Sequence, residues 1–143
     1  MDGIKSFFSG FRAAASGLSA ERARVDVIAR NIANAQTTHT PDGGPYRREV
    51  LRFAPILERL GDGTTRTLGV QVTGVERDAE TPFERIHDPD HPDADAEGFV
   101  LMPNVNTARE MADLITAMRA YEANASVQEN FVQMAERALR MAQ

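Results

Sequence analysis

The chain has 143 residues, a formal net charge of -5 and no cysteine. Without cysteine it can contain no disulfide, no thiolate metal site and no cysteine nucleophile. Residues 76–98 hold nine acidic side chains against two arginines. Because a phosphate backbone is bound by clustered lysine and arginine, this local charge predicts that nucleic acid is not a partner.

The N-terminal segment lacks the continuous apolar core of a secretory signal. Its phenylalanines are interrupted by Ser9, Gly10 and Arg12, so we expect no cleaved signal peptide. No apolar run approaches the ~20 residues that a membrane-spanning helix needs, so we also expect no direct membrane span.

A seven-residue apolar repeat runs through the first third of the chain. Its main row is Ile4, Phe11, Leu18, Val25 and Ile32, and its companion row is Phe7, Ala14, Ile28 and Ala35, broken only by Glu21. This spacing predicts a long helix, from about Ile4 to Ala35, with a narrow seam for burial against another helix. Glycine lowers helix stability by roughly 1 kcal/mol relative to alanine, so Gly10 and Gly17 predict a helix that is marginal alone.

The same repeat returns in the last third of the chain. Its rows are Met111, Met118, Ala125, Val132 and Leu139, with Leu114, Tyr121, Ala135 and Ala142 beside them. We expect a second long helix here, running nearly to Gln143. It should begin near Asn106 or Thr107, either of which can cap it, with Glu110 placed as in a capping box.

The segment between the helices is predicted to contain a small β unit. Residues 46–57 contain closely spaced apolar side chains, and apolar and other residues alternate in 68–73. A glycine-rich turn separates the two segments, so they indicate a hairpin. Residues 82–92 carry proline and aspartate too often for regular structure, and residues 98–102 suggest a last short strand. Residues 36–45 have lost the repeat and predict a loop.

The predicted fold is therefore mainly α with a small β region. Its parts are an N-terminal helix (1–35), a loop and small β-containing middle domain (36–104), and a C-terminal helix (105–143). Each terminal helix carries an apolar seam suited to burial against another helix.

Residues 87–95 form the most site-like cluster, with two histidines and four aspartates. Such side chains can bind a hard or borderline metal. However, prolines extend the backbone, and the spacing matches neither a calcium loop nor a helical histidine pair. We favour a solvated, turn-rich loop and expect no metal and no cofactor.

No residue pattern predicts catalysis. Gly43 and Gly44 lack the lysine and hydroxyl residue of a phosphate loop, and no serine lies in a nucleophile elbow. The three histidines all fall in predicted loops. We therefore expect a protein that is not an enzyme and has no small-molecule substrate.

Two asparagines stand in the closing turn of the first predicted helix, where asparagine competes for backbone hydrogen bonds. Asn31 and Asn34 could cap the last carbonyls, reach a neighbouring chain, or simply form a polar helix end. Asn124 follows Tyr121 inside the second helix. A buried Asn124 would fix the register in which the helix packs against its partner. The alternative is that Asn124 belongs to an exposed polar face.

The sequence resembles the flagellar basal-body rod proteins over essentially its whole length. The general rod and hook pattern is AASGLSAERARVDVIARNIANAQT at residues 14–37. Three further stretches resemble the proximal-rod members: GGPYRREVLRF at 43–53, DPDHPDADAEGFVLMPNVN at 88–106 and EMADLITAMRAYEANASV at 110–127.

This resemblance implies a structural subunit of the periplasm-spanning rod that transmits torque from motor to hook. Its implied partners are copies of itself, other flagellar rod proteins and the flagellar type III export apparatus, which exports subunits without signal cleavage. The implied assembly uses the terminal helices, which are expected to pair as a coiled-coil-like inner layer, with the β-containing middle as an outer domain.

We predict an assembly seam formed by Leu18, Val25, Ile28, Ile32, Met111, Ile115, Met118 and Val132. Register is predicted to depend on Asn31, Asn34, Tyr121 and Asn124. Three alternatives remain open: another rod subunit, a soluble helical adaptor that binds a partner helix, and a metal hydrolase built on His87, Asp88, Asp90 and His91.

Overall fold

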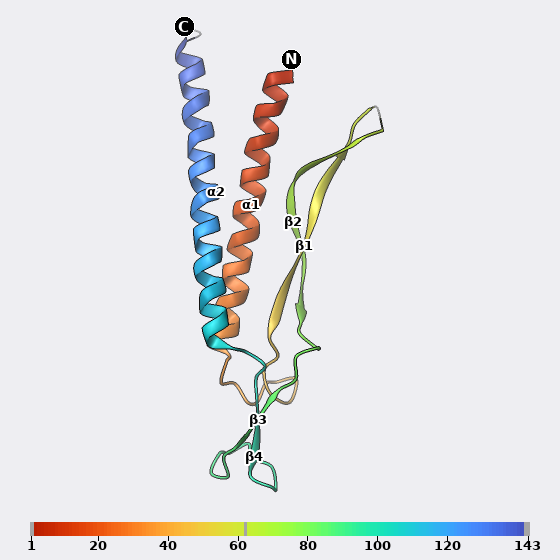
Figure 1. Cartoon of the computed structure of the whole chain (residues 1–143), viewed down its shortest axis with the longest axis vertical. Coiled ribbons are helices and arrows are strands. Elements are labelled where there is room, and N and C mark those ends of the chain that lie inside the picture. Colours follow the sequence, from red (N-terminus) through yellow and green to blue (C-terminus); the bar gives the residue numbers. More distant parts are fainter. Residues whose placement is uncertain (1, 62, 142–143) are drawn as a thin grey trace.

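The computed structural model describes residues 2–61 and 63–141, with side chains from residue 8 onward. Two long helices, α1 (Asp2–Ala33) and α2 (Thr107–Met141), run antiparallel along the molecule, and both chain ends lie at the same end of it (Figure 1). Between them in the sequence, four strands form two separate two-stranded antiparallel sheets. The prediction of two long helices with a small β region is confirmed.

The two helices approach closely where α1 carries glycine. A Cβ atom on Gly10 would lie 2.8 Å from the Phe131 ring, and one on Gly17 would lie 3.0 Å from the Asn124 amide nitrogen. On the facing side of α2, Ala117 is fully buried. The glycines that weaken α1 as an isolated helix therefore make room for α2.

A long ribbon lies on the side of α1 away from α2 (Figure 1). It consists of β1 (Glu49–Arg59) and β2 (Thr65–Arg77), which confirms the predicted hairpin. Val70 N donates a 3.1 Å hydrogen bond to Ser16 Oγ on α1. Gly69 lies directly against Ser16, and any Cβ there would collide with the hydroxyl, so glycine is what allows this contact.

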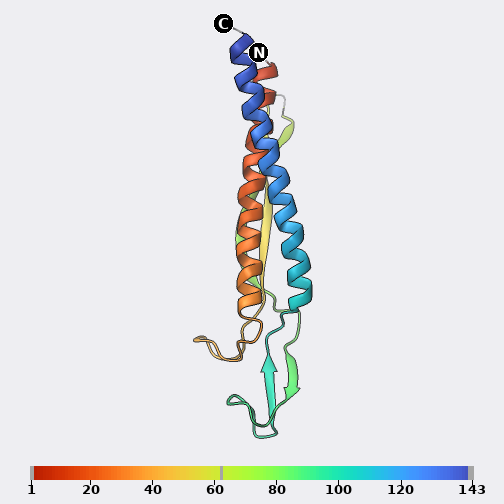
Figure 2. The ribbon, with the colours of Figure 1, turned by 90° about the vertical axis from the view of Figure 1, so that its left-hand side faces the viewer.

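A second, shorter hairpin projects beyond the other end of the helix pair (Figure 2). Its strands are β3 (Glu84–His87) and β4 (Phe99–Met102). The predicted last strand near residues 98–102 is confirmed as β4. The prediction of no regular structure in residues 82–92 is wrong, because β3 forms there by pairing with β4. That pairing is non-local, and the local proline and aspartate content does not indicate it.

The start of α2 differs from the predicted capping box. Asn106 is the cap, since its Oδ1 accepts a 3.0 Å hydrogen bond from Arg109 N. Glu110 does not reach back toward Thr107, because its carboxylate turns to α1 and is fully buried there.

The buried apolar core is small for a chain of this length. The buried apolar side chains are Ala14, Ala20, Val27, Ile28, Leu68, Val100 and Ala117. Many larger ones remain exposed, above all on α2. In the described part of the chain, neither helix is long and apolar enough to cross a membrane.

Candidate assembly site

Asn31 in α1 connects three elements through one side chain. Its Nδ2 donates to Glu49 O at 2.9 Å and to Glu110 Oε2 at 3.1 Å. Its Oδ1 accepts from Glu49 N at 2.9 Å and from Tyr46 OH at 3.0 Å. All the hydrogen-bonding capacity of this amide is used, and Asn31 is only 1% exposed. It therefore holds the end of α1 to β1 and to the start of α2.

Glu110 brings a negative charge into this buried region. Burying a carboxylate is costly unless it is paired and hydrogen-bonded. Here Arg48 Nε donates a 2.6 Å hydrogen bond to Oε1, while Asn31 donates to Oε2. Both oxygens thus have a partner, and the charge is compensated inside the protein.

Asn104 extends the same network to the chain before α2. Its Oδ1 accepts from Arg48 N at 2.8 Å, and its Nδ2 donates to Asp78 O and Thr81 O at 3.1 and 3.0 Å. The end of β2 is thereby fixed to the entry of α2. We call the connected residues the polar junction: Asn31, Tyr46, Arg48, Glu49, Asn104 and Glu110.

The environment of the junction also changes the acidity of Tyr46. Burial raises the pKa of the Tyr46 phenol to about 12, and the nearby Glu49 carboxylate acts in the same direction. Both effects disfavour the phenolate. Tyr46 therefore stays protonated and donates its hydrogen bond to Asn31 Oδ1.

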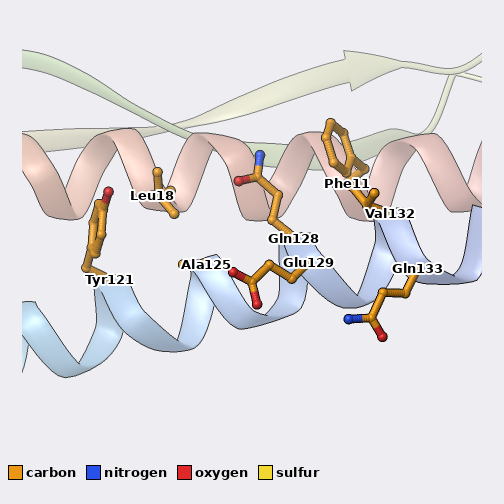
Figure 3. Close-up of a pocket in the computed structure, with 8 residues that line it drawn as sticks. All are labelled: Phe11, Leu18, Tyr121, Ala125, Gln128, Glu129, Val132 and Gln133. Atoms are coloured by element: carbon orange, nitrogen blue, oxygen red, sulfur yellow. The ribbon is translucent and has the colours of Figure 1, made fainter.

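An open groove follows one side of the helix pair. Its upper part has a volume of about 460 Å³ and is lined by Phe11 and Leu18 of α1 and Tyr121 and Val132 of α2. Figure 3 shows Tyr121 reaching from α2 toward Leu18. Most of the side chains in its walls are apolar, so the groove is suited to taking apolar side chains of a partner.

The groove continues along the helix pair as a second hollow of about 360 Å³ that shares Tyr121. Arg22 and Val25 border it on α1, and Met118 and Glu122 border it on α2. We call both parts together the apolar groove. Its apolar lining residues are Phe11, Leu18, Val25, Met118, Tyr121, Ala125 and Val132, and its upper part is also lined by Gln128, Glu129 and Gln133.

The residues of the predicted assembly seam differ in burial between the two helices. On α1, Ile28 is buried, and Leu18, Val25 and Ile32 are half-buried. On α2 all the predicted seam residues are exposed: Met111, Ile115, Met118 and Val132. The contact between the two helices of one chain uses a neighbouring row of α2 instead, formed by Glu110, Ala117, Asn124 and Phe131. The predicted row on α2 is therefore open at the surface.

The residues predicted to set register take different positions. Asn34 Nδ2 donates to Arg30 O at 2.9 Å, so Asn34 caps a helix carbonyl. Asn31 bonds within its own chain, as described above. Tyr121 borders the apolar groove, and Asn124 packs against Gly17.

The acidic segment after β3 is a set of turns. Asp95 Oδ1 accepts hydrogen bonds from Phe99 N and Glu97 N, both at 2.9 Å, and Arg85 donates to its other oxygen. The bond from Phe99 N is the main reason why the pKa of Asp95 lies below its usual range. Within residues 2–61 and 63–141, no group of three or more histidine and carboxylate side chains is arranged to hold a metal ion.

Sequence reasoning missed most of the polar junction. Arg48, Tyr46 and Asn104 lie in segments with no periodic pattern, so nothing local indicates their partners. A signal did exist for Glu110. Glu110 lies seven residues before Ala117 on α2, and Asn31 lies at a multiple of seven residues from Gly17 on α1. The α2 row through Glu110 and Ala117 faces the α1 row through Gly17 and Asn31.

Comparison with known proteins identifies the family. A model of flagella basal body rod proteins matches residues 11–38, and a model of the flagellar basal body rod FlgEFG protein C-terminal region matches residues 96–141. The chain is 43% identical to the flagellar basal-body rod protein FlgC of Borreliella burgdorferi, over 95% of this chain and 97% of that protein.

Two further relatives carry the same name. FlgC of Bacillus subtilis is 38% identical over 82% of this chain and 85% of that protein. FlgC of Salmonella typhimurium is 36% identical over 93% of this chain and 96% of that protein. Proteins of this family are structural and not enzymes. The chain therefore belongs to the FlgC family of flagellar basal-body rod proteins, as a structural subunit of the proximal rod.

Proposed function

We propose that this subunit assembles into the rod through its terminal helices, with the apolar groove and the exposed seam residues of α2 buried against neighbouring subunits. The observation that carries this proposal is the exposure of Met111, Ile115 and Met118, which are 55%, 54% and 49% exposed. Fully burying such a side chain stabilises a protein by roughly 1.5–3 kcal/mol. Exposed apolar rows of this kind mark interaction surfaces.

The proposed pairing of α1 and α2 is coiled-coil-like. Support comes from the spacing of their contacts, because Gly10 and Gly17 of α1 face Phe131 and Asn124 of α2, each pair one heptad from the next. Torque is then carried by many packed contacts at once, and no single residue transmits it. The polar junction adds rigidity, since Asn31 ties α1 to both β1 and α2.

The proposed partners are copies of this chain, other flagellar rod proteins and the flagellar export apparatus. The proposed location is the periplasm-spanning rod, reached without cleavage of a signal peptide. The small buried core supports export before folding, because a chain that leaves so many apolar side chains exposed gains much of its stability in the assembly.

The experiment is a comparison of three variants in a flagellated strain that lacks its own FlgC. Met118→Asp places a charge on the exposed seam, and Met118→Leu is the matched conservative control. Ile28→Asp places the same charge inside the subunit, where Ile28 is 5% exposed. Incorporation into isolated basal bodies is measured by immunoblot, and the fold of each purified chain by circular dichroism.

We expect Met118→Asp to keep the helical signal of the free chain and to be absent from basal bodies. Met118→Leu should be incorporated normally. Ile28→Asp should lose both incorporation and stability, because it buries an unpaired charge. Normal incorporation of Met118→Asp would contradict the proposed assembly surface.

A further inference from the structure

We propose that the occupant of the exposed side of α2 is α1 of a second copy of this chain, held by complementary charges. This inference rests on the proposed function, because it names the neighbour that the seam meets. The α2 flank is formed by Met111, Ile115, Met118, Glu122, Glu129 and Val132, which are spaced by three, four or seven residues along one side of that helix. The α1 flank is formed by Phe8, Arg12, Ala15, Ser19, Arg22 and Asp26, on a different side of α1 from Gly10 and Gly17, and its Arg22 borders the apolar groove.

The charged residues of the α2 flank are acidic. Glu122 and Glu129 are exposed, and neither makes an ion pair with any residue in the described part of the chain. They stand one heptad apart beside Met118 and Val132, so they border an apolar strip. A partner for this flank must offer apolar side chains flanked by cations.

The α1 flank of the same chain offers that combination. Arg12 and Arg22 are exposed and make no ion pair with the described residues, while Asp26 is the one acid of the flank. Phe8 is 58% exposed and supplies a large apolar side chain. The cations and apolar groups of one flank thus complement the acids and apolar groups of the other.

Within one chain the charges of the two flanks do not pair with each other. Arg22 and Glu122 both border the apolar groove, yet no ion pair joins them. A contact of either flank with the same flank of another copy is also disfavoured. An α2–α2 contact would bring Glu122 and Glu129 of both copies together, and an α1–α1 contact would do the same with arginines.

A contact between two different patches has a geometric consequence. In the arrangement we propose, each copy uses its α2 flank toward one neighbour and its α1 flank toward another, so the contact repeats around a ring or along a helix. Such a head-to-tail contact fits a subunit of a tubular rod.

The first test exchanges the charges. One variant carries Glu122→Arg and Glu129→Arg, a second carries Arg12→Glu and Arg22→Glu, and a third carries all four changes. Each is expressed in a strain without FlgC, and its amount in isolated basal bodies is compared with wild type. The neutral variant Glu122→Gln with Glu129→Gln is the matched control for lost attraction without repulsion.

We expect each two-residue reversal to lower incorporation about tenfold. A single exposed ion pair contributes little, but each reversal replaces attraction with repulsion at two positions in every contact. The neutral control should fall between these variants and wild type. The four-residue variant should regain most of the loss, because both flanks have changed sign. Failure of the four-residue variant to exceed either reversal alone would overturn the inference.

The second test uses the absence of cysteine from the chain. Ser126 lies between Glu122 and Glu129, and Ser19 lies between Arg12 and Arg22; both are exposed. A chain with Ser19→Cys and Ser126→Cys should form disulfide-linked dimers and longer oligomers in oxidised basal bodies. Either single substitution should form none. Dimers with Ser126→Cys alone would show an α2–α2 contact and overturn the inference, as would the absence of oligomers from the double variant.

The outcomes also separate this inference from the proposed function. If Met118→Asp prevents incorporation while the charge reversals do not, the helices assemble but the neighbour of α2 is not α1 of another copy. If neither change has an effect, the proposed function and the inference both fail.

Discussion

Asn31 and Glu110 are 79 residues apart in the sequence, yet Asn31 Nδ2 donates a 3.1 Å hydrogen bond to Glu110 Oε2. Two heptads away along both helices, Gly17 of α1 meets Asn124 of α2. The polar contact and the glycine contact belong to the same line of facing positions. We propose that this hydrogen bond sets the register in which the two terminal helices pack, at the end where both helices join the β region.

Replacing Glu110 with glutamine should destabilise the subunit. The variant removes the charge that pairs with Arg48 and turns one of its two acceptor oxygens into a donor, so either Arg48 Nε or Asn31 Nδ2 loses its acceptor. We expect a loss of about 2–3 kcal/mol in the free energy of unfolding. Urea denaturation of the purified chain, followed by far-UV circular dichroism, measures it.

Glu136→Gln is the matched control for that variant, because Glu136 lies on the same helix and is exposed. It should change the free energy of unfolding by less than about 0.5 kcal/mol. Equal effects of the two substitutions would show that the buried carboxylate does not stabilise the fold.

Replacing Gly17 with leucine should push the helices apart. Even the first side-chain carbon would lie 3.0–3.2 Å from the Asn124 side chain, and leucine adds further atoms beyond it. We expect destabilisation by about 1–3 kcal/mol, despite the better helix propensity of leucine. Thermal unfolding of this variant is compared with Ala29→Leu, where the new side chain replaces an exposed alanine. A Gly17→Leu protein as stable as Ala29→Leu would rule out close packing at this position.

The raised pKa of Tyr46 predicts a loss of stability in alkali. Below pH 10 the phenol is protonated in both folded and unfolded chains. Between pH 10 and about 12 the unfolded chain loses this proton and the folded chain keeps it, so the free energy of unfolding falls as pH rises. Tyr46→Phe should be less stable at neutral pH, because the hydrogen bond to Asn31 is lost. Its deficit should shrink between pH 10 and 12, and a constant deficit would contradict this interpretation.

The helices of this fold could be predicted because their signal is local and long. The repeat through Phe11, Leu18 and Val25 indicates a helix wherever its partner lies. The bounds came close for the same reason: α1 ends at Ala33, and the predicted end was Ala35. The strand β3 was not predicted, because it forms by pairing with β4 and a run of turns separates the two strands in the sequence.

The site was less predictable, because burial depends on which neighbour covers each row. The repeat marked an apolar row on α2, but only the structure shows that Glu110 and Ala117 face α1 and leave Met118 exposed. The polar junction was beyond sequence reasoning. Asn104 and Arg48 meet through contacts between segments 56 residues apart, and no periodic pattern relates them.

We propose that the exposed seam of α2 is covered in the rod, and thiol labelling of Met118→Cys can show whether Met118 is buried there. The chain has no other cysteine, so the label reports this position alone, provided that the variant still supports swimming. We expect rapid labelling of the purified chain, protection in intact basal bodies, and renewed labelling after the basal bodies are dissociated. Equal labelling of the free chain and of intact basal bodies would contradict it, because Met118 would then face solvent in the assembled rod.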